Sequence, residues 1–329
     1  MSERVPEQRY KQVQDDYMST TPAHRLEPAL ARELHTLSVS RHWVRIGVFA
    51  LLYLAGAAGA IYVAGTAHWL AAVPLYLLAG ASLHGISLFT HEAVHGTLSR
   101  NPYFNGILGA LCAMPVLQNF AAYRVLHLRH HQHLGEEGDP DHYQNYTRWT
   151  WLVFCMNWLR LIIGYPVYIT AIPLLGLRQG TGRERGLILL ELATLGSLIA
   201  AVWLSPLPRH WLLHGWLAPM IFINTMVNIR GMSQHTLLEH ADDEVKGTRT
   251  ILTQPLVRFF MCNENYHLEH HLHPGVPWYH LPRVHAALAP ELRRQGAPYI
   301  PSYASFVREF LHGSLKRSPL GWKRNTTEP

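Results

Sequence analysis

Three clusters of histidines in this sequence have the spacing of metal ligands. Within each cluster the histidines follow one another at helical intervals, so that the rings share one face of a helix and can reach one ion. The first cluster has the pattern H-x-x-x-H and the other two have the pattern H-x-x-H-H. The clustered residues are His91 and His95, then His127, His130 and His131, and finally His267, His270 and His271.

The number of histidines indicates two metal ions. Eight clustered imidazoles, together with the lone candidate His235, exceed what one four-coordinate ion can use. A metal-free cluster is disfavoured, because imidazole is about half protonated near pH 6.5 and crowded rings would compete for few partners. Ligation by nitrogen without thiolate suits iron, zinc, copper or nickel. The residues themselves leave the choice of metal open.

Long apolar segments must position these clusters. No Asp, Glu, Lys or Arg occurs from Ile46 to Thr90, a run that fits two membrane-spanning helices of roughly 20 residues each. The sequence predicts four transmembrane helices in two hairpins, at about Ile46–Thr66, Trp69–Thr90, Gly186–Leu204 and Trp211–Ile229. Two further apolar stretches, Phe104–Leu117 and Trp151–Leu177, are short or interrupted by proline or arginine and are predicted to be interfacial or half-buried.

Basic residues predict the orientation of the chain. The two hairpin links hold only Arg209, and nearly all other Lys and Arg residues lie on the opposite side, which is expected to face the cytosol. We therefore expect a multi-pass protein of the inner (cytoplasmic) membrane, in contact with membrane lipids and with both termini cytosolic. The same flanking charge accounts for the net charge of +6, so no nucleic-acid partner is expected.

The predicted fold is all-α, a multi-pass membrane protein with a cytosolic, histidine-rich cap. Residues 1–42 are expected to form a cytosolic arm, and residues 43–230 the transmembrane region with the first two histidine clusters. Residues 231–314 would form the cap with the third cluster, and residues 315–329 a disordered tail. The three cysteines are scattered and predict neither a disulfide framework nor a cysteine-based zinc site.

The residues around the clusters resemble the membrane fatty acid desaturase superfamily. The similarity extends beyond the three histidine boxes to Asp139-Pro140-Asp141, Thr248-Arg249-Thr250 and Pro277-Trp278, and it covers roughly Trp43 to Leu288. That superfamily includes fatty acid desaturases, lipid hydroxylases, and carotenoid ketolases and hydroxylases, and it binds a diiron centre through nine histidines. The resemblance implies two iron ions, O₂ as co-substrate, and the ligands His91, His95, His127, His130, His131, His235, His267, His270 and His271.

The implied activity is oxygen-dependent desaturation of an unactivated C–C bond in a fatty-acyl or similar lipid-like substrate, with the reacting methylene in an apolar tunnel. A hydroxylase or ketolase of a lipid or carotenoid is the alternative within the superfamily, and no acid–base catalytic residue is required. Electrons are expected from a ferredoxin-like donor, since the chain has no flavin, haem or iron–sulfur motif. The chain departs from stearoyl-type desaturases at Gly231, where that branch has Asn, and in its shorter first box.

Carboxylates near the boxes are candidate acceptors for the second N–H of the ligand imidazoles, which would fix the tautomers of the rings. They are Asp139, Asp141 and Glu269. The first box, His91-Glu92-Ala93-Val94-His95, also matches the H-E-x-x-H pattern of zinc proteases, in which the Glu is the general base. A protease would leave six of the nine histidines unexplained, and a metal transporter would place its ligands at mid-membrane rather than at the ends of spans.

Overall fold

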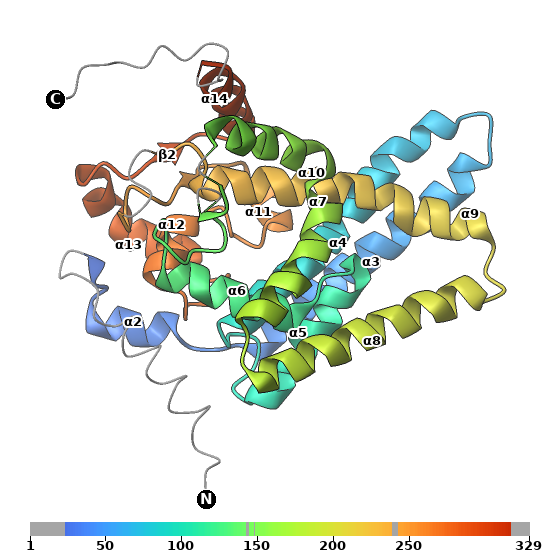
Figure 1. Cartoon of the computed structure of the whole chain (residues 1–329), viewed down its shortest axis with the longest axis horizontal. Coiled ribbons are helices and arrows are strands. Elements are labelled where there is room, and N and C mark those ends of the chain that lie inside the picture. The colour runs from blue at the N-terminus through green and yellow to red at the C-terminus, as the bar shows by residue number, and fades with distance from the viewer. Residues whose placement is uncertain (1–23, 143–144, 148, 239–242, 317–329) are drawn as a thin grey trace, which may run out of the picture.

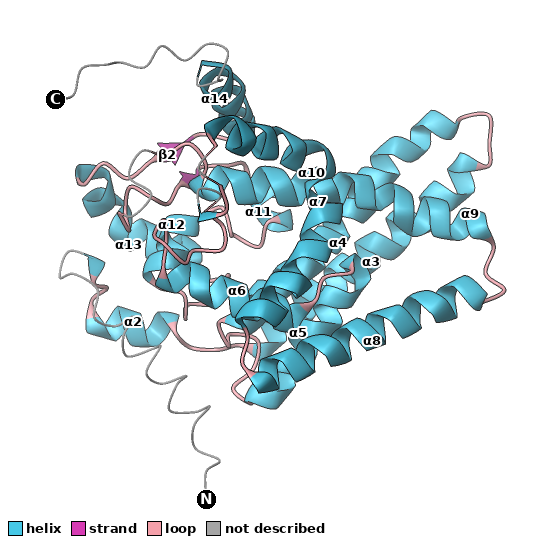
Figure 2. Ribbon diagram, in the orientation of Figure 1, coloured by secondary structure: helices cyan, strands magenta, loops and turns pink. Residues whose placement is uncertain are grey.

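Helices make up most of the described chain and strands only two short segments, in agreement with the all-α prediction (Figure 2). The computed structural model describes residues 24–142, 145–147, 149–238 and 243–316. Residues 1–23 of the predicted arm and most of the predicted tail, from residue 317, lie outside these ranges. The first two residues assigned to that tail, 315 and 316, continue helix α14 (Tyr303–Lys316).

Five helices of the described chain are long and apolar enough to cross a membrane. At a rise of about 1.5 Å per residue, each exceeds the roughly 30 Å of a bilayer core. They are α3 (Val39–Ala64), α4 (Ala72–Val94) with the 3₁₀ turn Trp69–Ala71, α7 (Thr150–Gln179), α8 (Gly182–Leu204), and α9 (Arg209–Leu212) continued through the π-helical turn Leu213–Leu217 into α10 (Ala218–His235).

Helix α7 corrects the prediction of four candidate spans. The prolines at 166 and 173 do not end the helix, and its one non-helical residue is Ile163, with φ −129° and ψ 18°. A proline inside a helix removes one backbone hydrogen bond and crowds the carbonyl four residues earlier, which explains a kink just before Pro166. The helix continues on both sides of this kink, so the stretch predicted to be interfacial has the length and composition of a fifth span.

The second apolar stretch predicted to be interfacial forms a sharp bend. Helix α5 (Pro102–Ala113) and the 3₁₀ turn Met114–Val116 meet α6 (Phe120–Gln132) at 106°, as in a broken span or a re-entrant loop. Glu191 of α8 stabilises the start of α6, because its carboxylate accepts a hydrogen bond of 3.0 Å from the backbone N–H of Ala121. The bend turns the second histidine cluster, on α6, toward the end of α4.

The C-terminal region packs short elements against the ends of α4, α6 and α10 (Figure 1). They are α11 (Pro255–Phe260), α12 (His267–Leu272), α13 (Leu281–Arg294), and the parallel pair β1 (Thr250–Ile251) and β2 (Tyr299–Ile300), with α2 (Pro28–Leu34) from the N-terminal side. Arg249 is buried beside β1, and its guanidinium donates to the carbonyls of Ser233 and Thr236 at the end of α10. This contact holds the end of α10 against the cap.

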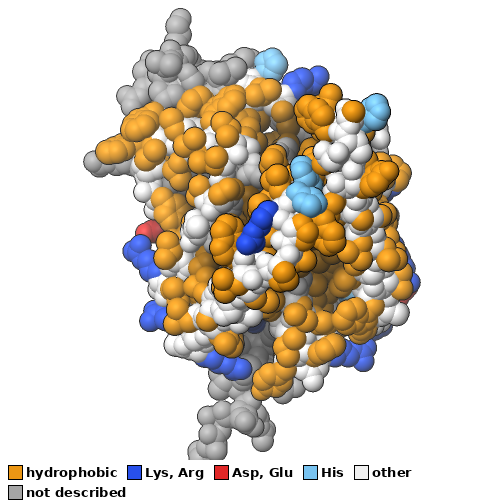
Figure 3. Space-filling model, turned by 90° about the vertical axis from the view of Figure 1, so that its right-hand side faces the viewer, with side chains coloured by type: hydrophobic (Ala, Val, Ile, Leu, Met, Phe, Trp, Pro, Cys, Tyr) orange, Lys and Arg blue, Asp and Glu red, His pale blue; other side chains and the backbone are white. Residues whose placement is uncertain are grey.

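Apolar side chains cover the outer faces of the long helices. Figure 3 shows hydrophobic side chains over most of the molecular end that carries the α3–α4 and α8–α9 links, with few charges among them. Leu51 and Tyr62 of α3 and Leu204 of α8 are 68%, 78% and 82% exposed. So much contiguous exposed apolar surface is costly in water, and it suits contact with lipid.

Candidate metal centre

Nine histidines from four helices converge where the ends of the long helices meet the cap. The first two come from the end of α4, three from α6, one from the last residue of α10, and three from the short helix α12. They are the nine that the family resemblance implies: His91, His95, His127, His130, His131, His235, His267, His270 and His271. The other histidines of the described chain belong to neither of the two metal-ligand groups below.

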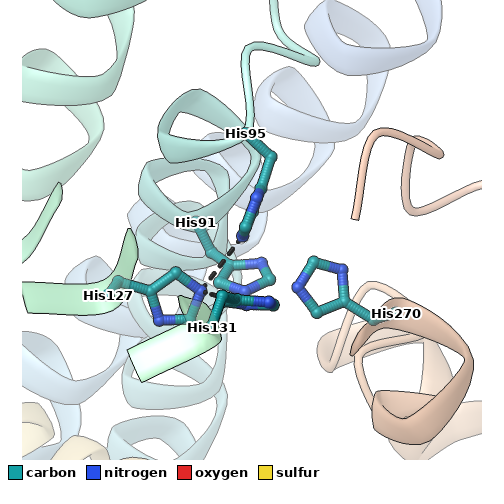
Figure 4. Close-up of side chains that lie close together, drawn as sticks. All are labelled: His91, His95, His127, His131 and His270. Carbon is teal, nitrogen blue, oxygen red and sulfur yellow. Dashed lines mark hydrogen bonds between the residues drawn. The ribbon is translucent and has the colours of Figure 1, made fainter. Parts of the chain in front are cut away.

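Five of these histidines form the first group, with one ring nitrogen of each within 4.8 Å of all the others (Figure 4). The Nε2 atom of His127 lies 3.0 Å from that of His95 and 3.1 Å from that of His131. His91 stands beside them on α4, and His270 approaches from α12 on the opposite side. Residues separated by up to 179 positions in the sequence therefore point at one common centre.

Three of the remaining four histidines form the second group, and the fourth, His267, adjoins it. Ring nitrogens of His130, His235 and His271 lie within 4.8 Å of one another. The Nε2 atom of His235 is 3.3 Å from that of His130 and 3.1 Å from that of His267, which is itself 3.1 Å from Nε2 of His271. The two groups adjoin, since the rings of His131 and His271 stack with centroids 4.2 Å apart.

The distances between these nitrogens fit metal coordination. With metal–nitrogen bonds of about 2.1 Å, neighbouring ligand atoms lie roughly 3.0 Å apart in an octahedron and roughly 3.4 Å apart in a tetrahedron. Hydrogen bonding alone does not explain this pattern. One imidazole nitrogen can make a single in-plane hydrogen bond, but Nε2 of His127 and Nε2 of His267 each lie close to two other histidine nitrogens. Among the described residues, the buried Nε2 atoms of His91 and His270 have no hydrogen-bond partner.

The surroundings of α12 favour the neutral form of its three imidazoles, which is the form that binds a metal. Burial, followed by repulsion from the neighbouring histidines, lowers the pKa of His267, His270 and His271 well below the usual value. A neutral ring keeps one nitrogen lone pair free to bind a cation.

Asp139 and Asp141, the two predicted acceptors after the second box, lie in different surroundings. The Asp139 carboxylate is buried and lies 2.9 Å from Nδ1 of His130, and it also accepts from the backbone N–H groups of Gly135 and Asp141. The Asp141 side chain is 58% exposed, with its carboxylate 4.0 Å from Nδ1 of His130. Asp139 is thus placed to orient His130, while Asp141 contributes mainly through its backbone.

Glu264 is a contact of the first group that sequence reasoning missed. One carboxylate oxygen contacts Nδ1 of His91 and the other forms an ion pair with Arg230 of α10, and the Glu264 side chain is 3% exposed. Burial alone would raise the pKa of Glu264, but the charges of His91 and Arg230 outweigh it and lower the pKa to about 2. In the sequence, only its position three residues before the third histidine box could have pointed to Glu264, because this residue belongs to no motif and no helical pattern.

Glu269, the third predicted acceptor, contacts different residues from those expected. Its carboxylate accepts from the Thr250 hydroxyl at 2.6 Å and the Tyr299 hydroxyl at 3.2 Å, and it lies 2.5 Å from Nδ1 of His285. Although Glu269 is within the third box, it faces α13 and the two short strands, and thereby fixes α12 to the cap. The Nδ1 atoms of His235 and His267 instead meet the Gly247 carbonyl and the Gln234 side chain.

Comparison with known proteins agrees with this geometry. A family model described as fatty acid desaturase matches residues 67–303, more than half of the chain. The chain belongs to the fatty acid desaturase family. Similar proteins include an sn-1 oleoyl-lipid 12-desaturase of Picosynechococcus sp., 22% identical over 79% of this chain and 80% of the relative. A dihydrorhizobitoxine desaturase of Bradyrhizobium elkanii is 29% identical over 72% of each chain, and a beta-carotene ketolase of Paracoccus sp. (strain PC1) is 27% identical over 76% of this chain and 90% of the relative.

In this desaturase-family protein, Glu92 of the H-E-x-x-H pattern has a structural environment. Its Oε2 atom accepts a hydrogen bond of 2.7 Å from the Thr97 hydroxyl and another of 3.2 Å from the backbone N–H of Trp278. These contacts link the end of α4 to the loop before α13. A general base of a zinc protease would instead need its carboxylate free to take a proton from a metal-bound water.

Gly231, where the chain departs from the stearoyl-type branch of the family, adjoins an arginine from α7. A Cβ atom at Gly231 would lie 2.6 Å from an Nη atom of Arg160. The missing side chain therefore makes room for the Arg160 guanidinium beside the last turn of α10. An Asn at this position would require Arg160 to move.

Proposed function

We propose that the protein is an oxygen-dependent diiron oxidoreductase that desaturates an unactivated C–C bond of a fatty-acyl or similar lipid-like substrate. The observation that carries this proposal is the convergence of nine histidines, six of them buried and three half-buried, in two adjoining groups at the ends of apolar helices. Membership of the fatty acid desaturase family supports iron as the metal and O₂ as the co-substrate. We assign the nine histidines as its ligands: the five of the first group, the three of the second, and His267 beside them.

The protein residues have defined tasks in this proposal. When bound, the iron pair supplies the redox chemistry by which O₂ removes hydrogen from a C–H bond. The imidazoles present their lone pairs, while Asp139 lies within hydrogen-bond distance of Nδ1 of His130 and Glu264 contacts Nδ1 of His91, so that both rings keep one orientation. Burial of six of the nine histidines limits the access of bulk water to the reacting carbon. Desaturation with two electrons, two protons and one O₂ yields an alkene and two water molecules.

Hydroxylation or ketolation is the second candidate reaction. The beta-carotene ketolases of two Paracoccus strains align with this chain over 90% and 86% of their own lengths. The same residues would serve both reactions, because removal of a second hydrogen gives a double bond and oxygen transfer gives an alcohol. The position of the substrate carbon relative to the histidines decides between these outcomes.

For the orientation we propose that the histidine end faces the cytosol. The links Gly65–His68 and Ser205–His210 lie at the end of the long helices away from the histidines, and Arg209 is their only basic residue apart from histidine (Figure 1). Both termini then lie on the cytosolic side of the inner membrane. Electrons would come from a ferredoxin-like protein that docks on this basic side of the molecule.

Two measurements test the proposed function together. Elemental analysis of the purified chain should approach two irons per chain, and mass spectrometry of lipid and pigment extracts should show a new oxidised product only in cells that express it. The His270→Ala variant is the matched inactive control. One tightly bound zinc without iron would contradict the diiron centre, and identical extracts with and without an iron-loaded chain would contradict the oxidation of a lipid or pigment.

A further inference from the structure

A cavity beside His91 has a lining that the expected apolar tunnel does not explain. It lies between α4, α6, α7 and α10, and its lining includes Thr90, His91, Gln118, Tyr123, Tyr168 and Arg230. We refer to it as the polar cavity. Of its ten lining residues, only Leu88 and Val227 have purely hydrocarbon side chains. A site for a plain methylene chain would be lined mainly by such side chains.

Hydrogen-bond donors of the polar cavity remain available. The Tyr168 hydroxyl oxygen accepts from Nε2 of Gln118 at 3.1 Å, and Gln118 Oε1 lies 3.4 Å from the Thr90 hydroxyl. Within the part of the chain that the structure describes, the Tyr168 hydroxyl accepts this bond and donates none, and the buried Nε of Arg230 has no partner. A buried donor such as Arg230 Nε is costly unless a ligand or water meets it.

The size of the polar cavity and its charges limit what it can hold. The space corresponds to about one water molecule, so it fits a single polar group rather than a chain segment. The charge of Arg230 is already balanced by Glu264, which leaves no net charge to attract an anion. The preferred group is therefore neutral and able to accept hydrogen bonds, as a hydroxyl or a carbonyl oxygen is.

We propose that the polar cavity binds a neutral hydroxyl or carbonyl group of the substrate, so that the oxidised C–H bond lies close to an oxygen-bearing carbon. His91 belongs both to the lining of the cavity and to the first histidine group, which places this oxygen next to the reacting position. The substrate class is thus an oxygenated amphiphile oxidised near its polar group, and not a hydrocarbon oxidised in the middle of its chain. This inference rests on the proposed function, because it assigns a substrate class to the same site.

Equilibrium binding to the purified full chain in detergent micelles, after incubation with iron, tests the inference. The probes are radiolabelled 1-dodecanol, dodecane and dodecanoate, compared at equal mole fraction in the micelles. We expect 1-dodecanol to bind roughly tenfold more tightly than dodecane, as one or two additional buried hydrogen bonds provide. Dodecanoate should bind more weakly than 1-dodecanol, because the cavity offers no unbalanced positive charge.

Two variants and a matched control test whether residues of the polar cavity cause the preference for 1-dodecanol. Tyr168→Phe removes one free donor and Gln118→Leu removes the group that orients it, so each should reduce the preference for 1-dodecanol to about threefold or less. Tyr76→Phe removes a hydroxyl that contacts His214 outside the cavity, and it should keep the full preference. Far-UV circular dichroism and iron content are measured for every variant, so that a folding defect is recognised.

Three results would overturn the inference: equal binding of dodecane and 1-dodecanol, absence of 1-dodecanol binding, or tightest binding of dodecanoate. An unchanged preference in both cavity variants would likewise remove Tyr168 and Gln118 from the site and contradict the assignment. Failure of the proposed function would look different, because it would appear as absence of iron or of oxygen consumption. The preference between the two neutral probes can be measured in either case.

Discussion

The two ends of the long helices differ in the interactions that stabilise them. At one end, imidazoles, carboxylates and Arg230 lie together, and Glu264 joins His91 of α4 to Arg230 of α10. At the other end, the α3–α4 and α8–α9 links join helices whose apolar side chains face outward (Figure 3). The histidine end therefore depends on the exact placement of a few groups, whereas the link end depends on length and hydrophobicity.

This difference predicts where substitutions act. A buried polar group that loses its partner costs far more than an exposed side chain that loses a contact. Substitutions at the histidine end should thus change metal content and activity steeply, in proportion to how directly they touch the ligands. Substitutions in the hairpin links should leave both unchanged.

The largest effect is expected for a ligand histidine. His270→Ala removes one of the five nitrogens of the first group and should abolish detectable oxidation, with iron clearly below two per chain. His312→Ala on α14 replaces an exposed histidine that bonds only the Arg308 carbonyl among described residues, and should behave as wild type. Full activity of His270→Ala in the product assay would remove this residue from the centre.

The next effect concerns the acceptor of His91. Glu264→Gln replaces the anionic partner of Nδ1 by a neutral amide and leaves Arg230 without its counter-ion, so iron affinity or activity should fall about 10- to 100-fold. Glu291→Gln changes a carboxylate on α13 that pairs with the exposed Arg294, and should have no measurable effect. An iron titration followed by the product assay checks both variants, and equal behaviour of the two would show that Glu264 does not support the centre.

A smaller effect is expected for Glu92, which both the desaturase and the protease hypotheses place next to ligand histidines. Glu92→Gln keeps an oxygen that can accept from Thr97 and Trp278, so activity should fall only a few-fold when iron is supplied in excess. A zinc protease would lose turnover by roughly a hundredfold or more. Complete loss of activity in Glu92→Gln together with wild-type activity in His270→Ala would favour the protease.

The smallest effect on activity is expected at the link end, where labelling can also determine the orientation of the chain in the membrane. Ala67→Cys and Arg209→Cys, each in a Cys155→Ser background, should keep wild-type oxidation within about twofold. Both should react with a membrane-impermeant maleimide added outside intact cells. Arg294→Cys, at an exposed position of α13, should react only after permeabilisation. The opposite labelling pattern would place the histidines on the side away from a cytosolic electron donor.

The sequence by itself determined the helical class, the apolar hairpins and the identity of the clustered histidines. These features depend on local periodicity: a charge-free run identifies helices suited to lipid, and spacings of three and four place rings on one helix face. The prediction from local sequence was wrong for α7. Proline usually ends a helix in water-soluble proteins, but here the helix continues past Pro166 and Pro173.

Only the tertiary structure decided how these histidines divide into two groups and which carboxylates serve them. Glu264 reaches His91 because the loop before α12 folds over the end of α4, while Glu269, inside the third box, faces α13 instead. Sequence spacing fixes which side chains share one helix face, but the partners of a buried polar group come from other helices and from distant parts of the chain. The polar cavity beside His91 has the same origin, since α4, α6, α7 and α10 each contribute to a lining that no single segment reveals.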